Sequence, residues 1–296
     1  MTGSVAGGQP DNFGGQQATL AIAWDFDSAV GQVNATFPYH FRRTPLDQEL
    51  EAVAELRGLS ARLGIAMTFA TVGLAAEDVP APFGARGELQ ALHAAGHEIA
   101  SHAWRHEWLP HITTQQLRRS LVRSKLALEQ AVGEVGAVTG FVPPFNRPMT
   151  WLARGEVRPG DRWAYPPAAG ATLDRLIPTV SGAGYRWVRA GYRRRLGRTR
   201  ADRLFAPELV AGCVNVPHHY NGFDDHAHSL LDEAVLRRRL VVLTGHPAGL
   251  FRSTNEHRSL VVGLLELAAS RRDAGEMAIV TVGRAADRFR TDEGGR

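Results

Sequence analysis

The chain has 296 residues, of which 44% are hydrophobic and 22% are charged, so it can form one large α/β domain or two small ones. This composition excludes a fibrous, collagen-like or wholly disordered protein. The net charge of +4 rests on arginine, since Lys125 is the only lysine, and we interpret the basic runs 193–195 and 237–239 as solvated surface rather than a nucleic-acid site. A single cysteine, Cys213, excludes an internal disulfide and a thiolate zinc cluster, and its apolar neighbours predict a small buried side chain.

The two ends of the chain differ in composition from the rest. Residues 1–17 are rich in Gly and Gln and lack the apolar core of a signal peptide. No later stretch is apolar enough to span a bilayer, so we expect no membrane partner. These patterns predict a flexible segment at 1–17, a single domain at 18–290, a flexible tail at 291–296 and a cytoplasmic location.

Apolar strand-like runs alternate with amphipathic helical runs along the chain, which is typical of parallel strands joined by crossover helices. One helix is predicted to begin with Thr44 as N-cap and Pro45 at its first position and to stop at Gly64, and another to begin near Thr113. The predicted strands are 19–24, 65–72, 97–101, 137–142, 185–188, 213–217, 240–244 and 277–282. Seven or eight such units without a linker favour one closed or nearly closed barrel.

Polar residues follow several of these strands, at the end of a parallel barrel where active sites gather. They are Asp25, Asp27, His102, residues 143–147, His218, His219 and His246. The segments 28–43, 147–171 and 191–207 are too long for tight connections, so we expect them to wall a pocket.

His102 and His106 are spaced four residues apart, which would place both imidazoles on one side of a helical turn. Asp27, after a distant strand, can supply the third ligand of a tetrahedral divalent ion and leave one position open for catalysis. Residue 103 is alanine, so the glutamate of the zinc-protease signature His-Glu-x-x-His is absent. His97, earlier in the same segment, is expected to be buried and hydrogen-bonded instead of metal-bound.

Asp25 and Asp27 lie two residues apart and can therefore face the same pocket. In our interpretation Asp27 holds the ion, which lowers the pKa of its water toward about 7, and Asp25 accepts the proton as that water attacks an acyl carbon. Exchange of the two roles remains open. A simpler alternative is that both aspartates cap the following segment.

The segment 95–106, Ala-Gly-His-Glu-Ile-Ala-Ser-His-Ala-Trp-Arg-His, and the strand at 66–73 resemble the polysaccharide deacetylases, the NodB-like carbohydrate esterases. The resemblance runs from about Thr19 to Val282. It implies a distorted (β/α) barrel of seven or eight parallel strands and hydrolytic deacylation, usually of an N-acetyl sugar. It also implies a divalent ion, Zn²⁺ or else Co²⁺ or similar, and a small-molecule or oligosaccharide substrate.

The segment 141–147 corresponds to that family's Arg-Pro-Pro-aromatic-Gly motif, so Pro144, Phe145, Asn146 and Arg147 are expected to bind substrate. The main-chain amide of Phe145 would donate a hydrogen bond to the oxyanion, because a main-chain donor does not depend on the identity of the side chain. A plain turn is the alternative. Val142 replaces the family's base-orienting arginine, and Arg147 or another arginine would have to supply that charge.

Residues 243–247 resemble the family's last motif, whose histidine, here His246, acts as general acid. The aspartate that usually holds this histidine has no equivalent at 185–189, which leaves Asp224 or Asp225 as candidates. His218 and His219 match no motif; we assign one to substrate and the other to packing. Trp104 is also expected near the ligand.

The leading hypothesis is a metal-dependent deacetylase acting on an amino sugar or glycoside, with Asp25 as base and His246 as acid. One alternative keeps the fold but opens a cyclic amide or imide, as the allantoinase-like relatives do, some of them without metal. Another is a catalytically impaired carbohydrate-binding relative. The complete ligand set and the presence of Asp25 favour the deacetylase.

Overall fold

The computed structural model describes residues 17–35, 43–146, 173–190 and 204–294, and one curved sheet of ten strands runs through these parts. The order is β6-β7-β5-β4-β3-β2-β1-β9-β8, with β10 paired to β1. Every pairing is parallel except the β6–β7 hairpin. The strands are β1 (Ala18–Phe26), β2 (Thr68–Thr71), β3 (Glu98–Ser101), β4 (Gly140–Phe141), β5 (Trp187–Val188), β6 (Glu208–Val210), β7 (Cys213–Asn215), β8 (Tyr220–Asn221), β9 (Leu240–Gly245) and β10 (Met277–Val280).

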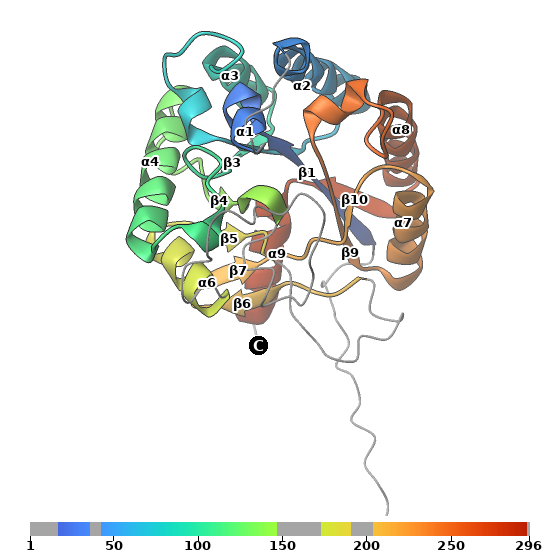
Figure 1. Ribbon diagram of the computed structural model, residues 1–296. Helices are drawn as coiled ribbons and strands as arrows, with labels where there is room; N and C mark the ends of the chain where they lie inside the picture. The colour runs from blue at the N-terminus through green and yellow to red at the C-terminus, as the bar shows by residue number, and fades with distance from the viewer. Residues whose placement is uncertain (1–16, 36–42, 147–172, 191–203, 295–296) are drawn as a thin grey trace, which may run out of the picture.

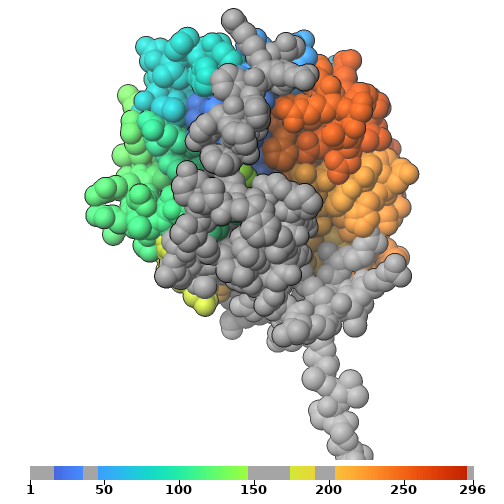
Figure 2. Space-filling view, viewed as in Figure 1, coloured from blue at the N-terminus to red at the C-terminus, as the bar shows by residue number. Residues whose placement is uncertain are grey.

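Most of the helices surround the outer face of this sheet, and α9 lies on its inner face (Figure 1). They are α1 (Ser28–Asn34), α2 (Arg43–Leu63), α3 (Arg86–Ala94), α4 (Thr114–Val132), α6 (Leu173–Gly182), α7 (Asp225–Arg237), α8 (Arg258–Asp273) and α9 (Val282–Gly294). Short 3₁₀ turns occur at η1 (Gly73–Ala76), η2 (Leu109–His111), η3 (Pro144–Asn146) and η5 (Pro247–Phe251). Figure 2 shows that the α4 region and the α7–α8 region form opposite sides of the molecule.

The capping signals in the sequence set the ends of two helices. At the start of α4, Thr113 accepts the Gln116 amide while the Gln116 side chain accepts the Thr113 amide, a complete capping box. The start predicted there is confirmed. Helix α2 ends at Leu63 before Gly64, whose φ of 62° is the left-handed value that glycine adopts freely. It begins at Arg43, one residue before the predicted cap.

The sheet is apolar on both faces because helices cover the outside and α9 fills one end of the inside. The inner cluster is built from small β1, β2 and β3 residues and from α9: Ala21, Ala23, Ala70, Ala100, Val282, Ala285 and Ala286. Glu98, at the start of β3, accepts the Gly283 amide of α9 at 2.8 Å. The amino-terminal end of the strands is thereby closed, and the opposite end is left for chemistry.

All eight predicted strands are present, most of them shorter than predicted; 137–142, for example, is reduced to Gly140–Phe141. The strands β6 and β8 were missed: they lie at the two ends of the strand order and are only partly buried, so they lack the continuous apolar run of the inner strands. Within the described ranges no pairing joins β6 to β8, so the barrel is open there. This is the distorted (β/α) barrel that the resemblance implied.

Two expectations from composition can be compared with this fold. Cys213 is fully buried in β7, and burial raises the pKa of its thiol to about 12, which agrees with a packing role. Among the helices of the described ranges, none has the length and apolar character needed to cross a membrane.

Candidate metal centre

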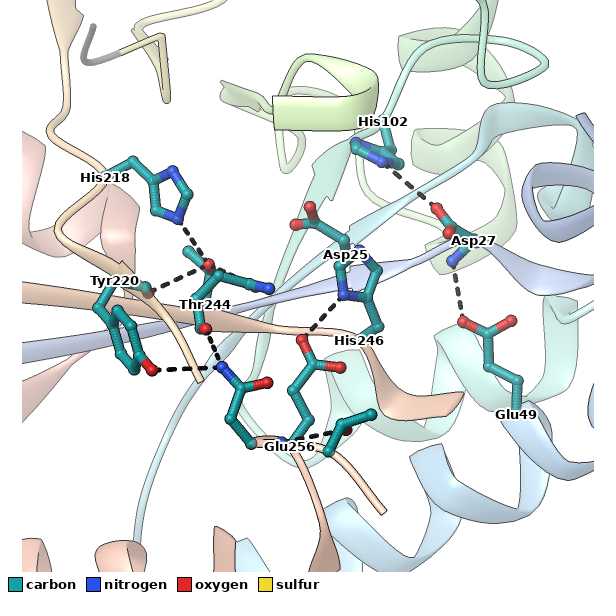
Figure 3. A network of polar contacts seen from close by, with 12 residues as sticks. Asp25, Asp27, Glu49, His102, His218, Tyr220, Thr244, His246 and Glu256 are labelled. Carbon is teal, nitrogen blue, oxygen red and sulfur yellow. Dashed lines mark hydrogen bonds and ion pairs between the residues drawn. The ribbon is translucent and has the colours of Figure 1, made fainter. Parts of the chain in front are cut away.

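Strand β1 carries Asp25 and Asp27 to its carboxyl end, where they are 1% and 8% exposed. Asp27 takes the N-cap position of α1 but makes no side-chain cap hydrogen bond. Instead, its Oδ1 lies 3.4 Å from His102 Nε2 and 3.3 Å from His106 Nε2. The capping alternative is therefore wrong for Asp27, whose carboxylate faces two imidazoles; Figure 3 shows the one of His102.

The two histidines meet through a turn, and the predicted helical turn is absent at 102–106. Ala103 and His106 have φ of 66° and 60°, which costs a non-glycine residue roughly 1–2 kcal/mol. Four hydrogen bonds to three elements hold this main chain: Gly73 N of η1 to Ala103 O, Leu74 N of η1 to Trp104 O, Trp104 N to Ser120 Oγ of α4, and Asn34 Nδ2 of α1 to Arg105 O. Spacing alone could not show this, because the turn is stabilised by residues far away in the chain.

The imidazole of His102 is oriented by the chain itself. Its Nδ1 lies 2.8 Å from the Val142 carbonyl, to which it donates, so the lone pair of Nε2 faces Asp27 and His106. Val142 lacks the arginine side chain of the family motif, but its carbonyl orients a metal-ligand candidate.

The protonation states also suit a cation. Burial lowers the pKa of His106 to about 4, so its ring is neutral at pH 7 and can offer a lone pair. Burial alone would raise the pKa of Asp27, but its interactions with the neighbouring imidazoles, that of His106 first, bring it below the ordinary range. Asp27 is therefore anionic beside the neutral imidazole of His106.

These three residues fit a divalent metal ion. The ligand atoms of Asp27, His102 and His106 all lie within 4.8 Å of one another, the one such group found among the described residues. The Asp27 Oδ1 atom and the His106 Nδ1 atom are buried and have no hydrogen-bond partner in the described part of the chain. One carboxylate and two imidazoles match zinc and similar ions, and a buried carboxylate oxygen without a donor is otherwise costly.

Asp25 is paired with an arginine that sequence reasoning did not name. Its Oδ2 accepts Arg189 Nη2 at 2.7 Å, and both side chains are buried. Burial would raise the pKa of Asp25, but Arg189 makes the largest opposing contribution and lowers it below its usual value. Arg189 thus supplies the charge expected from Arg147 or another arginine. Arg147 itself lies outside the described residues.

His246 follows β9, and its Nδ1 lies 3.0 Å from Glu256 Oε1. Burial opposes its charged form, but the Glu256 hydrogen bond and charge outweigh it and raise the pKa of His246 to about 10. The expectation that Asp224 or Asp225 holds this histidine is wrong. Asp224 caps α7 and accepts the Tyr220 hydroxyl, and Asp225 is exposed on the first turn of α7.

Phe145 lies next to the candidate metal ligands in η3, after Pro144 and before Asn146. Its φ is 64°, and its ring centroid lies 4.5 Å from that of His106. Residues 144–146 are therefore at the site, as expected, and substrate binding there stays a prediction. Trp104 is placed differently: the Arg123 guanidinium covers its ring at 3.8 Å, so the ring packs toward α4.

The two histidines after β7 have different environments. Both nitrogens of His219 are occupied, since Nδ1 accepts the Val242 amide at 2.8 Å and Nε2 lies 3.0 Å from Phe205 O. His219 is therefore a packing residue. His218 Nε2 lies 2.9 Å from Thr244 Oγ1, and in Figure 3 its ring is on the side of Asp25 away from His102. His218 is the member of the pair near the site.

A buried carboxylate on α2 was missed altogether. Glu49 is 1% exposed, and its Oε1 accepts the Asp27 amide at 3.1 Å. Burial, and then the Asp27 charge, raise the pKa of Glu49 to about 8. Its position in an ordinary helical pattern gave no signal, because only the packing of α2 on α1 brings it to the site.

Comparison with known proteins agrees with this geometry. Residues 47–150, which include both histidines and Phe145, match the family model described as polysaccharide deacetylase. A putative polysaccharide deacetylase from Mycobacterium smegmatis superposes with a TM-score of 0.64 at 16% identity, over 94% of this chain and 92% of that one. Puue allantoinase superposes with a TM-score of 0.58 at 16% identity, over 92% and 89%. No curated protein matches in sequence. At these identities the superpositions establish the fold alone.

Proposed function

We propose that this chain is an atypical relative of the polysaccharide deacetylases and a metal-dependent hydrolase that removes an acyl group, N-acetyl in the first instance, from an amino sugar or glycoside. The observation that carries the proposal is the meeting of Asp27, His102 and His106 beside Asp25 and His246. All five follow the carboxyl ends of three strands, at one end of the barrel.

The residues would divide the work as follows. Asp27, His102 and His106 would hold the ion, with Zn²⁺ as first choice and Co²⁺ as an alternative. When bound, the ion would act as a Lewis acid that lowers the pKa of a water and polarises the acyl oxygen. A buried ion also explains why Asp27 Oδ1 has no donor among the described residues.

Asp25 would act as the general base. Its Oδ2 is held by Arg189, whereas its Oδ1 has no hydrogen-bond partner among the described residues and can accept a proton. Because Arg189 keeps Asp25 anionic, the carboxylate is ready to accept that proton near neutral pH. Arg189 thereby replaces the arginine missing at Val142.

His246 would act as the general acid. Glu256 binds Nδ1, which leaves Nε2 to donate a proton to the leaving nitrogen. The raised pKa of about 10 keeps the imidazole of His246 protonated at neutral pH, so it holds a proton that it can give to the leaving amine nitrogen. We assign the Phe145 amide to the oxyanion, and Pro144, Asn146, Arg147 and His218 to substrate contact.

Acetate release from N-acetylated amino sugars and their short oligomers tests this function. Removal of metal with a chelator should abolish release, and added Zn²⁺ or Co²⁺ should restore it. The variants Asp27→Ala and His102→Ala should each lose at least about 100-fold in rate and should no longer retain metal. His257→Ala, an exposed histidine that caps α8, is the matched control and should keep full activity.

Three outcomes would contradict the proposal. Full activity in the chelated protein or in Asp27→Ala would remove the role of the metal. Turnover of a hydantoin or imide without acetate release would assign the site to cyclic amides. Metal and sugar binding without any product would indicate a carbohydrate-binding relative.

A further inference from the structure

Asp27 is enclosed by two residues to which no motif points, Gly31 on α1 and Glu49 on α2. The carboxylate of Glu49 accepts the Asp27 amide at 3.1 Å with Oε1 and the Gln32 side chain at 2.6 Å with Oε2. Glu49 is 1% exposed, so both hydrogen bonds are shielded from water. One side of the Asp27 main chain is thereby fixed to α2.

Gly31 fixes the other side. Its amide donates to the Asp27 carbonyl at 2.8 Å. A Cβ atom at residue 31 would lie 2.7 Å from Asp27 Cβ and 3.0 Å from Asp27 Cγ, closer than side chains tolerate. Any residue larger than glycine would therefore displace the Asp27 carboxylate or unwind α1.

Glycine at this position works against the helix that contains it. In a helix interior, glycine is about 1 kcal/mol less favourable than alanine. Gly31 lies in α1 and is buried, so neither solvent nor an unusual φ explains it. The space that it leaves for the Asp27 side chain does explain it.

The Asp27 side chain has no cap hydrogen bond that would orient it. Its direction toward His102 and His106 is therefore set through its main chain and through the free space at Gly31.

We propose that Gly31 and Glu49 are positioning residues of the metal centre: they hold Asp27 in the geometry that binds the ion. This inference rests on the metal site of the proposed function. It assigns no catalytic step to either residue.

The test is the Zn²⁺ dissociation constant of the purified full-length chain, measured by chelator competition after metal removal. Gly31→Ala and Glu49→Ala should weaken binding by about 10–100-fold, as loss of a supporting residue does in other metal sites. Glu49→Gln keeps an acceptor for the Asp27 amide but loses the acceptor for the Gln32 side chain, so its affinity should lie between those of Glu49→Ala and the parent.

Two variants serve as matched controls. Gly58→Ala changes a helical glycine of α2 that has nothing within 4 Å of the added Cβ. Glu98→Gln changes a half-buried carboxylate that also accepts a main-chain amide, at the opposite end of the strands. Both should keep the Zn²⁺ dissociation constant of the parent to within about twofold.

Thermal unfolding of the metal-free variants separates positioning from a merely structural role. A structural role would lower the melting temperature of metal-free Gly31→Ala and Glu49→Gln and leave Zn²⁺ affinity unchanged, which would overturn the inference. Weaker Zn²⁺ binding at unchanged metal-free stability supports it. A parent that binds no Zn²⁺ overturns it together with the proposed function, whereas a parent that binds Zn²⁺ but releases no acetate contradicts the function alone.

Discussion

Carboxylates lie at both ends of the barrel, half-buried at the amino-terminal end and buried at the carboxyl-terminal end, and they differ in their hydrogen bonds. At the amino-terminal end, Glu98 accepts hydrogen bonds from the Trp187 indole at 3.0 Å, the Thr68 hydroxyl at 2.8 Å and the Gly283 amide at 2.8 Å. At the carboxyl-terminal end, Asp25 and Asp27 each keep one buried oxygen without a partner among the described residues. A carboxylate whose oxygens accept hydrogen bonds holds structural elements together. A carboxylate oxygen with a free lone pair can instead accept a proton or bind a cation.

The main chain shows the same contrast. Four residues with left-handed φ surround the candidate site: Ser28, Ala103, His106 and Phe145, at 51°, 66°, 60° and 64°. The other two non-glycine residues of this kind in the described ranges, Ala211 and Arg238, lie in the β6–β7 turn and at the end of α7. Strain is thus concentrated where geometry must be exact for a ligand set and is otherwise confined to ordinary chain reversals.

Among the changes predicted here, replacing Asp25 by Asn at the carboxyl-terminal end of the barrel should have the largest effect. The rate of acetate release should fall by about 10²–10⁴-fold because a general base is lost, while bound metal is retained. Steady-state rates and metal content of the purified variant provide the check. If Asp25→Asn loses metal while Asp27→Asn keeps it, the roles of the two aspartates are reversed.

Replacing Arg189 by Met leaves Asp25 buried without its cation, so the free energy of unfolding should fall by about 3–5 kcal/mol. Urea denaturation measures the change. Arg290→Met is the control, since the Arg290–Asp287 pair is 43% and 46% exposed and should contribute less than about 1 kcal/mol. Equal, small losses in the two variants would show that the Arg189–Asp25 pair is not buried in solution.

We expect a smaller effect on stability from His97, which directly precedes β3. Its Nδ1 accepts the Met67 amide at 3.1 Å and its Nε2 lies 3.0 Å from Ser60 Oγ, so the expected buried, hydrogen-bonded state is confirmed. Burial lowers the pKa of His97 to about 4 from its ordinary 6.5. The unfolded chain therefore takes up this proton at higher pH than the folded one.

Stability from His97 is thus complete above about pH 6.5 and is lost as pH falls toward 4, by at most about 3 kcal/mol. Unfolding free energies of the parent and of His97→Gln, compared across this range, isolate the contribution. The parent should show the steeper loss toward acid pH. Parallel curves would mean that His97 titrates normally in the folded protein.

The sequence indicated much of the fold because the relevant signals are local. Apolar runs marked eight of the ten strands of the described sheet, and the Thr113 capping box and Gly64 marked helix ends. The spacing of His102 and His106 and the strand before Asp27 were enough to bring three ligand candidates together, since parallel strands end on one side of a sheet.

The residues that tune the site were decided by the tertiary structure alone. Arg189 lies 164 residues from Asp25 in sequence, and Glu256 reaches His246 across η5, so no spacing rule connects either pair. Glu49 reaches Asp27 only because α2 packs on α1. Local sequence determined which residues are buried and which strand ends meet, whereas the partner of a buried charge depended on the packing that brings distant elements together, because a buried charge is stabilised only by the groups that packing places around it.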